Sequence, residues 1–458
     1  MRAQPREREL LIWLLVIAAA VRMAYALGAW LVTRDPSVFI EQDSESYLAP
    51  ARELLARGTF AVRGIPELER TPGYPLLLVV GLWSGHVVPV TIVIQVALSV
   101  LTTLGVFVVA RRVTGDARAG LIAAALYAFE PISVRATSAL GTETLFTLLV
   151  VWAVALLVAY VRAPKRSALL AGTALLSVAA YVRPAGYYLS FGLLAFLAAA
   201  AIAARDWRRL SHFVLATVVA LSIVAPWHIR NRALDFGGFS AISAVNMYFY
   251  NAAAVEARRE RRSYADVQTA WGYHDGRVYL RRHPEQATWS RGRRFTYMGA
   301  EGGRIVKANL PVYARIHVAG MTRVMLDPGA LSLLQSYGLY EGNSGVLSVV
   351  VTDGLAAGIR RILHTNLLAF VLLGVLGMFL VLMYALAVRG WLTEHRTLDP
   401  AVLLSALSIA YFITIAGGPV GVGRFRHPAM PFVCVLAAMG LVTWWRGRHR
   451  DEQPSHGA

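Results

Sequence analysis

Long apolar runs recur along this chain and dominate its pattern of hydrophobic and polar positions. Many approach the length of about 20 residues that a helix needs to cross a bilayer. The pattern therefore predicts an all-α polytopic membrane protein. We expect about ten transmembrane helices, at 10–32, 75–110 (the second half being the spanning part), 118–131, 143–161, 167–182, 185–204, 210–230, 362–388, 399–416 and 428–445.

Arginines and lysines cluster in the short segments between these runs and in both tails. Because cytoplasmic segments carry such an excess, we expect that side to be cytoplasmic. Both termini then lie in the cytoplasm, and segments 33–74 and 231–361 lie outside. The basic segments are Arg2 to Arg8, Arg111 to Arg118, Arg162 to Arg166, Arg205 to Arg209, Arg389 to Arg396 and Arg446 to Arg450.

Composition supports a membrane protein, since 57% of the 458 residues are hydrophobic and only 16% are charged. Soluble chains carry about 25% charged residues. The formal charge of +18 is explained mostly by the cytoplasmic arginines, so we predict no nucleic-acid partner. The single cysteine, Cys434, cannot form an intramolecular disulfide and is expected to pack in the last span.

The chain divides into an N-terminal membrane domain (1–230), an extracytoplasmic insert (231–361) and a C-terminal three-span region (362–458). The insert alternates short apolar stretches with arginine-rich ones, which favours extracytoplasmic loop helices over the membrane domain. Its basic character suits either a solvated surface or contact with anionic lipids. There is no glycine-rich nucleotide loop of the Walker type, so energy from nucleotide hydrolysis is not expected.

The first external loop carries three carboxylates, Glu41, Asp43 and Glu45, immediately before an amphipathic helix predicted at 47–57. A carboxylate here can act as general base toward an attacking hydroxyl or amine, or the cluster can serve only to cap the helix. Gly58 is a suitable C-terminal cap. Because proline is tolerated only in the first turn, Pro50 predicts a helix start near Ser46.

Several polar residues inside or beside the spans are further candidates. Arg22 lies in the first span, where a charge needs a partner; it either faces the outer cavity or extends to the interface. Arg70 opens a rigid Arg-Thr-Pro-Gly-Tyr-Pro segment that includes Tyr74, and it suits phosphate binding or an interfacial position. No cofactor is assigned: His228, His427, Glu130 and Glu143 are residue types that could hold a divalent metal, but their spacing fits no compact metal motif.

In these motifs the chain resembles the membrane-embedded C-class glycosyltransferases that use polyprenyl-phosphate sugars. This class includes protein O-mannosyltransferases and the aminoarabinose and galacturonic acid transferases of lipid A. The resemblance rests on motifs in order along the chain: Asp43 with Tyr47, Ala51 and Gly58, Arg70 to Pro75, Pro131 with Gly141 to Glu143, Arg183 to Gly186, Pro226 to Asn231, and Gly423 to Pro428 with Pro431.

The resemblance implies an inverting transfer from a polyprenyl-phosphate donor to a lipid, polysaccharide or protein acceptor on the outer side of a bacterial inner or plasma membrane. Asp43 matches the catalytic carboxylate, and Glu143 matches an acidic residue of the second external loop. The resemblance also implies which residues bind the donor phosphate or sugar, because they match positions near the family's outer cavity. They are Arg70, Tyr74, Arg183, Arg230 and Arg424, with Arg22 as a further candidate.

Alternatives remain at two levels. Ser44 follows Asp43 where the mannosyltransferases have a glutamate, so Glu41 or Glu45 is the base in an alternative assignment. At the level of function, a transporter or flippase for a lipid-linked saccharide would also place arginines and a carboxylate in an outward cavity. The absence of visible repeats or paired broken helices argues against it. The sequence names neither the sugar nor the acceptor.

Overall fold

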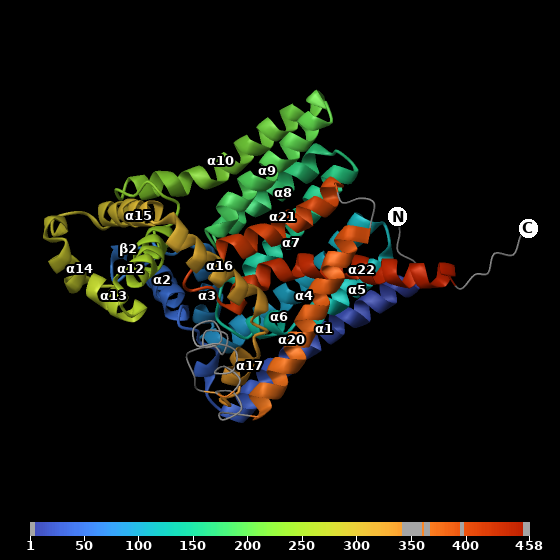
Figure 1. The fold of residues 1–458 in the computed structure, drawn as a ribbon, viewed down its shortest axis with the longest axis horizontal. Coiled ribbons are helices and arrows are strands. Elements are labelled where there is room, and N and C mark those ends of the chain that lie inside the picture. Colours follow the sequence, from blue (N-terminus) through green and yellow to red (C-terminus); the bar gives the residue numbers. More distant parts are fainter. Residues whose placement is uncertain (1–4, 341–359, 361–366, 394–397, 452–458) are drawn as a thin grey trace, which may run out of the picture.

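The computed structural model describes residues 5–340, 360, 367–393 and 398–451, and it is almost entirely helical (Figure 1). In the described residues the only sheet is a two-stranded antiparallel hairpin, β1 (Ala61–Val62) with β2 (Ile65–Pro66). The predicted all-α membrane fold is confirmed. Parts of the expected insert and of the span at 362–388 lie outside the described residues.

Seven helices of the described chain are long and apolar enough to cross a membrane. They are α1 (Pro5–Thr33), α4 (Val87–Thr114), α7 (Glu143–Arg162), α9 (Ala185–Ala203), α10 (Leu210–Arg232), α20 (Leu367–Thr393) and α22 (Met430–Asp451). Four shorter apolar helices accompany them: α3 (Gly73–Trp83), α5 (Ala117–Ala128), α8 (Arg166–Ala180) and α21 (Pro400–Ile415). The predicted spans at 118–131, 167–182 and 399–416 are thus helical but shorter than predicted.

The predicted run 75–110 forms two helices rather than one. It breaks between α3 and α4 at Gly85, whose φ of 73° is a left-handed conformation that favours glycine. The spanning part is α4, as predicted for the second half of the run. α3 is left as a short helix directly after Arg70 and Pro72.

The helix predicted after the first span, α2 (Ser44–Arg57), begins two residues before the predicted start. Its first residue is anchored by tertiary contacts, because the buried Ser44 hydroxyl donates to the Leu140 carbonyl (2.7 Å) and accepts from the Glu41 amide (2.8 Å). Pro50 therefore lies inside the helix, which corrects the prediction that it stands in the first turn. Gly58 caps the helix with a φ of 66°, as predicted.

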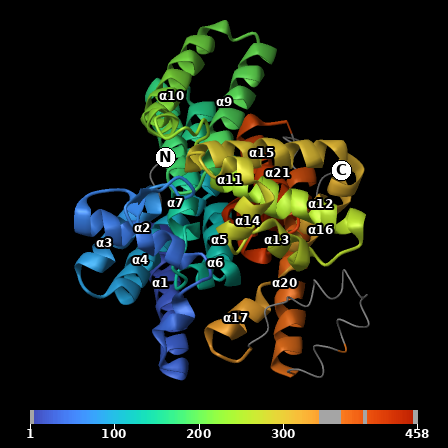
Figure 2. The ribbon, with the colours of Figure 1, turned by 90° about the vertical axis from the view of Figure 1, so that its left-hand side faces the viewer.

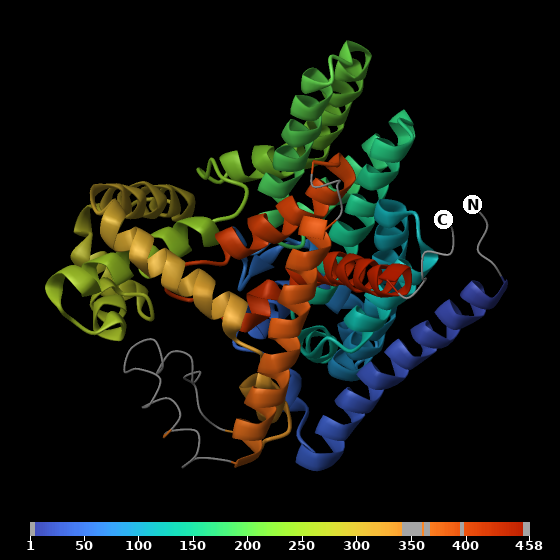
Figure 3. The same ribbon diagram turned by 45° about the vertical axis from the view of Figure 1, so that its right-hand side comes forward.

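The core of the bundle is formed by α4, α5, α7, α8 and α22, and Figure 3 shows α22 in red running through its centre. Cys434 is buried in α22 and free, as expected for a packing residue. α20 crosses α22 where two glycines meet, since a Cβ on Gly390 or Gly440 would collide with backbone of the facing helix. Small residues allow such close approach of membrane helices.

Basic segments that the sequence assigns to one side meet at one end of this bundle. Arg162 pairs with Asp399 (2.7 Å), and Arg446 pairs with Asp116 (2.6 Å). Figure 1 shows the beginning of α1 and the end of α22 on the right, opposite the insert helices on the left. The bundle therefore has two distinct polar ends, one with the basic segments and one with the first loop and the insert.

The described part of the insert contains several short helices and a hydrophobic core of its own (Figure 2). That core includes Tyr248, Phe249, Trp271, Phe295 and, from the first loop, Leu68. Its elements are α11 (Ile242–Val245), the π-helix η3 (Asn246–Ala252), α12 (Ala253–Glu260), α13 (Tyr264–Trp271), α14 (Gly276–Arg282), α15 (Arg291–Ala308), α16 (Leu310–Leu326) and α17 (Ala330–Ser336). The remaining elements are α6 (Pro131–Ala136) and the 3₁₀ turns η1 (Pro36–Phe39), η2 (Trp207–Arg209), η4 (Pro284–Gln286) and η5 (Gly423–Ala429).

Candidate active site

Asp43 lies where the loop after α1 enters α2, and its carboxylate faces two arginines. Oδ2 lies 2.6 Å from Nη2 of Arg424, and Oδ1 lies 3.3 Å from Nη2 of Arg70. Although Asp43 occupies the N-cap position of α2, its side chain makes no capping hydrogen bond. The carboxylate is therefore held by the arginines and not by the helix end.

Arg424 is carried by η5, just before α22, and bridges two carboxylates of the first loop. Besides Asp43 it contacts Glu41, with 3.4 Å between Nη1 and Oε2. Arg135, at the end of α6, holds the other oxygen of Glu41. Glu41 is thus placed between two cations, as Asp43 is.

Arg70 is fixed both at its side chain and at its backbone. Its guanidinium lies 4.6 Å from the ring centroid of Tyr47 and donates to the Tyr47 hydroxyl (3.2 Å). The buried carboxylate of Glu67 accepts from the backbone amides of Glu69 and Arg70, the latter at 3.0 Å. The turn that presents Arg70 to Asp43 is therefore built around Glu67.

A second acidic and basic pair stands beside the first. Arg183, between α8 and α9, pairs with Glu143 at the start of α7 (3.2 Å). The guanidinium groups of Arg183 (5.8 Å) and Arg424 (5.2 Å) both lie close to the Phe425 ring centroid. The structure thus brings five predicted residues, Asp43, Glu143, Arg70, Arg183 and Arg424, to one region.

The electrostatic balance at Asp43 favours the ionised carboxylate. Burial opposes ionisation, but Arg424 and Arg70 outweigh it, with a smaller contribution from Arg183, so the pKa of Asp43 lies below its ordinary value. Asp43 is therefore a carboxylate at neutral pH, and its two arginines reduce its basicity for as long as they remain paired with it.

Tyr74 is fully buried beside this region, where its hydroxyl donates to Gln95 (3.0 Å) and its ring meets the edge of Tyr47. Gln95 in turn donates to the carbonyls of Thr137 and Ala139. In this arrangement Tyr74 supports Tyr47, which in turn supports Arg70.

Three further predicted residues lie apart from the cluster. Arg22 is fully buried among α1, α4 and α5, bonded to Ser99 (2.7 Å) and to backbone carbonyls. Glu45 pairs with Arg52 on the exposed face of α2. Arg230, at the end of α10, donates to the Phe60 carbonyl (3.3 Å).

Two residues near the centre were not candidates in the sequence. Arg135 pairs with Glu41, but nothing in the sequence around Arg135, four residues after Pro131, indicates this ion pair. Tyr250 lies on the π-helix of the insert, hydrogen-bonded to Tyr273. Burial and the neighbouring Tyr273 and Tyr264 raise the pKa of Tyr250, and the charge of Asp43 adds a smaller contribution.

Among the residues that the structure describes, no three His, Cys, Asp or Glu side chains group together as a metal site would require. The ionic chemistry visible here belongs to carboxylates and arginines.

Residues 74–229 match the family model described as dolichyl-phosphate-mannose-protein mannosyltransferase. This segment includes Glu143 and Arg183 and excludes Asp43, Arg70 and Arg424. No curated protein sequence matches the chain significantly.

Solved structures match over nearly the whole chain. The archaeal oligosaccharyltransferase AglB from Archaeoglobus fulgidus, in complex with an inhibitory peptide and a dolichol-phosphate, has 16% identity and a TM-score of 0.55. The alignment covers 99% of this chain and 53% of AglB. The apo form of the Archaeoglobus fulgidus enzyme has 15% identity and a TM-score of 0.53, with 98% and 52% covered. The present chain thus spans about half the length of that enzyme.

A third match is ArnT from Cupriavidus metallidurans bound to undecaprenyl phosphate, with 18% identity, a TM-score of 0.39, and 94% and 78% of the two chains covered. The assignment of the fold rests on the AglB structures and on the family model, which matches residues 74–229. The chain has the fold of the membrane-embedded C-class glycosyltransferases, the class that its motifs indicate.

Proposed function

We propose that this protein is an inverting glycosyltransferase that moves a sugar from a polyprenyl-phosphate donor to an acceptor hydroxyl or amine. The observation that carries the proposal is the carboxylate of Asp43 held between Arg70 and Arg424. A transfer of this kind needs a base for the acceptor and cations for the phosphate that leaves, and both lie here within ion-pair distance.

The donor phosphate is the natural competitor for the two arginines. A phosphate accepts hydrogen bonds from arginine in the same geometry as a carboxylate and carries a comparable or larger charge. Phosphate binding to Arg424 and Arg70 would draw their charge away from Asp43 and raise its pKa from the depressed value in the free enzyme. The carboxylate would thus become a stronger base when the donor is bound.

Arg183, like Arg424, lies against the Phe425 ring, and it is paired with Glu143. We assign it to the charge that develops on the leaving phosphate. In the transfer step Asp43 takes the proton of the acceptor as its oxygen or nitrogen forms a bond to the anomeric carbon. The bond from that carbon to the phosphate oxygen breaks, and the electron pair leaves with polyprenyl phosphate. A single displacement inverts the anomeric configuration.

We expect the acceptor to bind on the side of the centre that the insert covers. Tyr250 and Tyr273 come from the insert, while the arginines come from the loops of the membrane domain. A donor entering laterally from the bilayer would reach Arg424 and Arg183 from the membrane, and the acceptor would enter beneath the insert. The acceptor remains in the class of lipids, polysaccharides and proteins.

We further propose that the end of the bundle with Asp43 is extracytoplasmic. Arg162 and Arg446 belong to the opposite end, where the basic segments gather, and that end is cytoplasmic under the positive-inside bias. The protein would then be an integral protein of a bacterial inner or plasma membrane, with both termini in the cytoplasm and the site outside.

Proteoliposomes supplied with a panel of radiolabelled polyprenyl-phosphate sugars separate transfer from transport. The proposal predicts that one donor loses its sugar to an acceptor or to water, with release of polyprenyl phosphate. Movement of intact labelled donor between leaflets, with no release of polyprenyl phosphate from any donor, would favour a flippase and overturn the proposal.

A further inference from the structure

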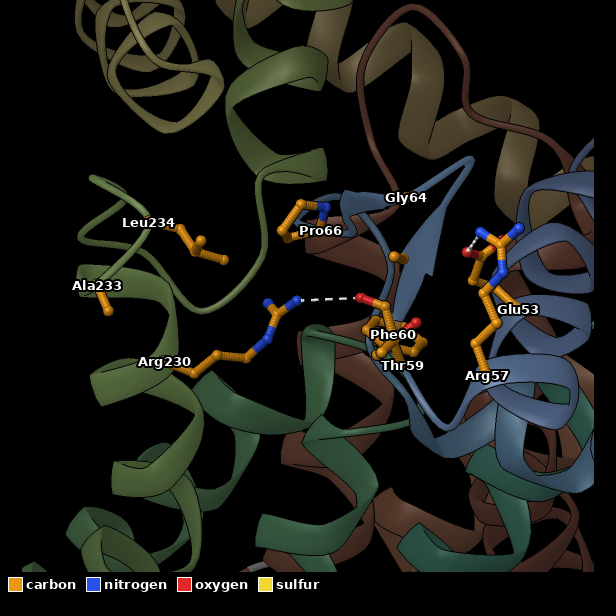
Figure 4. Close-up of a pocket in the computed structure, with 10 residues that line it drawn as sticks. Glu53, Arg57, Thr59, Phe60, Gly64, Pro66, Arg230, Ala233 and Leu234 are labelled. Atoms are coloured by element: carbon orange, nitrogen blue, oxygen red, sulfur yellow. Dashed lines mark hydrogen bonds and ion pairs between the residues drawn. The ribbon is translucent and has the colours of Figure 1, made fainter.

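A cavity of about 520 Å³ lies between the C-terminal end of α10 and the segment that follows α2 (Figure 4). Residues at the end of α10 form one wall, and the end of α2 with the hairpin β1–β2 forms the other. The lining includes Arg230, Ala233, Leu234, Glu53, Arg57 and Phe60. A volume of this size is in the usual range for binding pockets, which is about 300 to 1,000 Å³.

Arg230 is the principal charge in this cavity. Its guanidinium lies 4.5 Å from the Trp227 ring centroid and donates to the Phe60 carbonyl and to Asn231. Within the described residues it forms no ion pair, although Glu67 influences it from a greater distance. Glu67 itself is occupied by the amides of Glu69 and Arg70.

The other charges of the cavity neutralise each other, because Arg57 pairs with Glu53 at 2.8 Å. A net positive charge therefore remains at Arg230, half-buried and directed into the cavity, as Figure 4 shows. Such a charge favours an anion, and the planar guanidinium suits a phosphate oxygen pair.

The exposed face of α10 is apolar and leads toward the cavity. Val214, Val218 and Leu221 lie on one side of the helix and are each about half exposed or more, and Ile229, next to Arg230, is 68% exposed. An acyl chain can lie along such a face while its headgroup reaches the end of the helix. The cavity and this face together fit an amphiphile with a negative headgroup.

We propose that this cavity binds the phosphate headgroup of an anionic membrane lipid whose chains lie along α10. The site is separate from the Asp43 centre, since none of Asp43, Arg70 and Arg424 lines the cavity. The proposal goes beyond the proposed transfer and does not depend on it.

Binding of short-chain phosphatidylglycerol to the purified full chain in neutral detergent tests this directly, for example by native mass spectrometry. We expect saturable binding, about tenfold weaker in Arg230→Gln, while Arg232→Gln, an exposed arginine two residues on, binds as the wild type does. Ala233→Trp fills the cavity while Arg230 and Arg232 are retained, so it should weaken binding to a similar extent. This second variant keeps the test valid even if Arg230→Gln folds poorly.

Three outcomes would overturn the proposal. Binding that is unaffected in both Arg230→Gln and Ala233→Trp would place the lipid elsewhere. Equal binding of short-chain phosphatidylcholine would remove the role of charge. Displacement by inorganic phosphate at the same concentrations as the lipid would indicate an ion site without a lipid. Because no sugar donor is present, none of these results bears on transfer.

Discussion

Arg424 and Asp43 are 381 positions apart in the chain, yet Nη2 of one lies 2.6 Å from Oδ2 of the other. The ion pair joins the loop between α1 and α2 to the turn before α22. Because Arg424 also reaches Glu41, it organises both carboxylates that face the centre.

Replacement of Arg424 by lysine should reduce turnover by a factor of about 10² to 10³, the usual cost of losing a positioned donor at developing charge. Lysine keeps the charge but cannot bridge Asp43 and Glu41 with two nitrogens. Turnover and donor binding are measured together, with Arg262→Lys, an exposed arginine of the insert, as the matched control. Equal loss in the control would point to a general effect of replacing arginine by lysine rather than to the bridge that Arg424 forms.

The pH dependence of kcat/KM should reflect the depressed pKa of Asp43 in the free enzyme. The ordinary value is 3.8, and the arginines lower it, so the acid limb is expected below about pH 4. Arg70→Gln removes one of the lowering charges and should shift the acid limb to higher pH. An acid limb that stays in place in Arg70→Gln would assign it to another group.

The same pKa shift has a consequence for stability. Because the folded pKa is depressed, the ion pairs of Asp43 contribute fully above the unfolded pKa of 3.8, and the contribution is lost as the pH falls through the folded value. The difference in Tm between the wild type and Asp43→Asn should therefore be constant near neutral pH and decrease in acid below about pH 4.

Glu67 is expected to act as a positioning residue through Arg70. Glu67→Gln keeps an acceptor oxygen for the Glu69 and Arg70 amides but removes the negative charge near Arg70. We expect a rise in the KM for the donor of about tenfold with a smaller change in kcat, consistent with weakened charged hydrogen bonds. Glu67→Asp should restore part of the donor affinity, and Glu260→Gln on the insert surface is the control.

A KM unchanged in Glu67→Gln, in a protein of wild-type Tm, would limit Glu67 to a structural role in the turn.

The proposed orientation can be tested with single cysteines in a Cys434→Ala background. Thr59 is exposed at the end with Asp43, and Lys165 is exposed at the end with the basic segments. A membrane-impermeant maleimide should label Thr59→Cys in intact cells and Lys165→Cys only after lysis. The reverse pattern would place the Asp43 centre in the cytoplasm.

The sequence predicted the helical membrane fold and most of the charged centre, for identifiable physical reasons. Apolar length reveals spanning helices, and arginines beside proline and glycine turns reveal rigid outer loops. The turn signal pointed to Arg70 and the carboxylate cluster to Asp43, whereas Arg183 and Arg424 came from the resemblance of their motifs to the glycosyltransferase family. All of these signals are local, so the interaction of each arginine with a carboxylate came only from the structure.

Other features depend on contacts that local patterns do not encode. Ser44 begins α2 early because it bonds to Leu140, nearly one hundred residues away, and this bond leaves Pro50 inside the helix. Arg22 has the same sequence signal as a cavity arginine, yet the Ser99 hydroxyl and the carbonyls of Ala18 and Ala128 satisfy it inside the bundle. In both cases the tertiary contacts of the residue, and not its type, determine its structural role.

The central claim is that Asp43 is the base of a sugar transfer from a polyprenyl-phosphate donor. Its most direct test measures turnover and donor binding of the wild type, Asp43→Asn and Asp43→Glu with the donor that the panel identifies. The account predicts that Asp43→Asn binds donor but loses at least about 10² of turnover, with partial activity in Asp43→Glu. Full turnover in a folded Asp43→Asn protein would contradict the account and move the base to Glu41, Glu45 or Glu143.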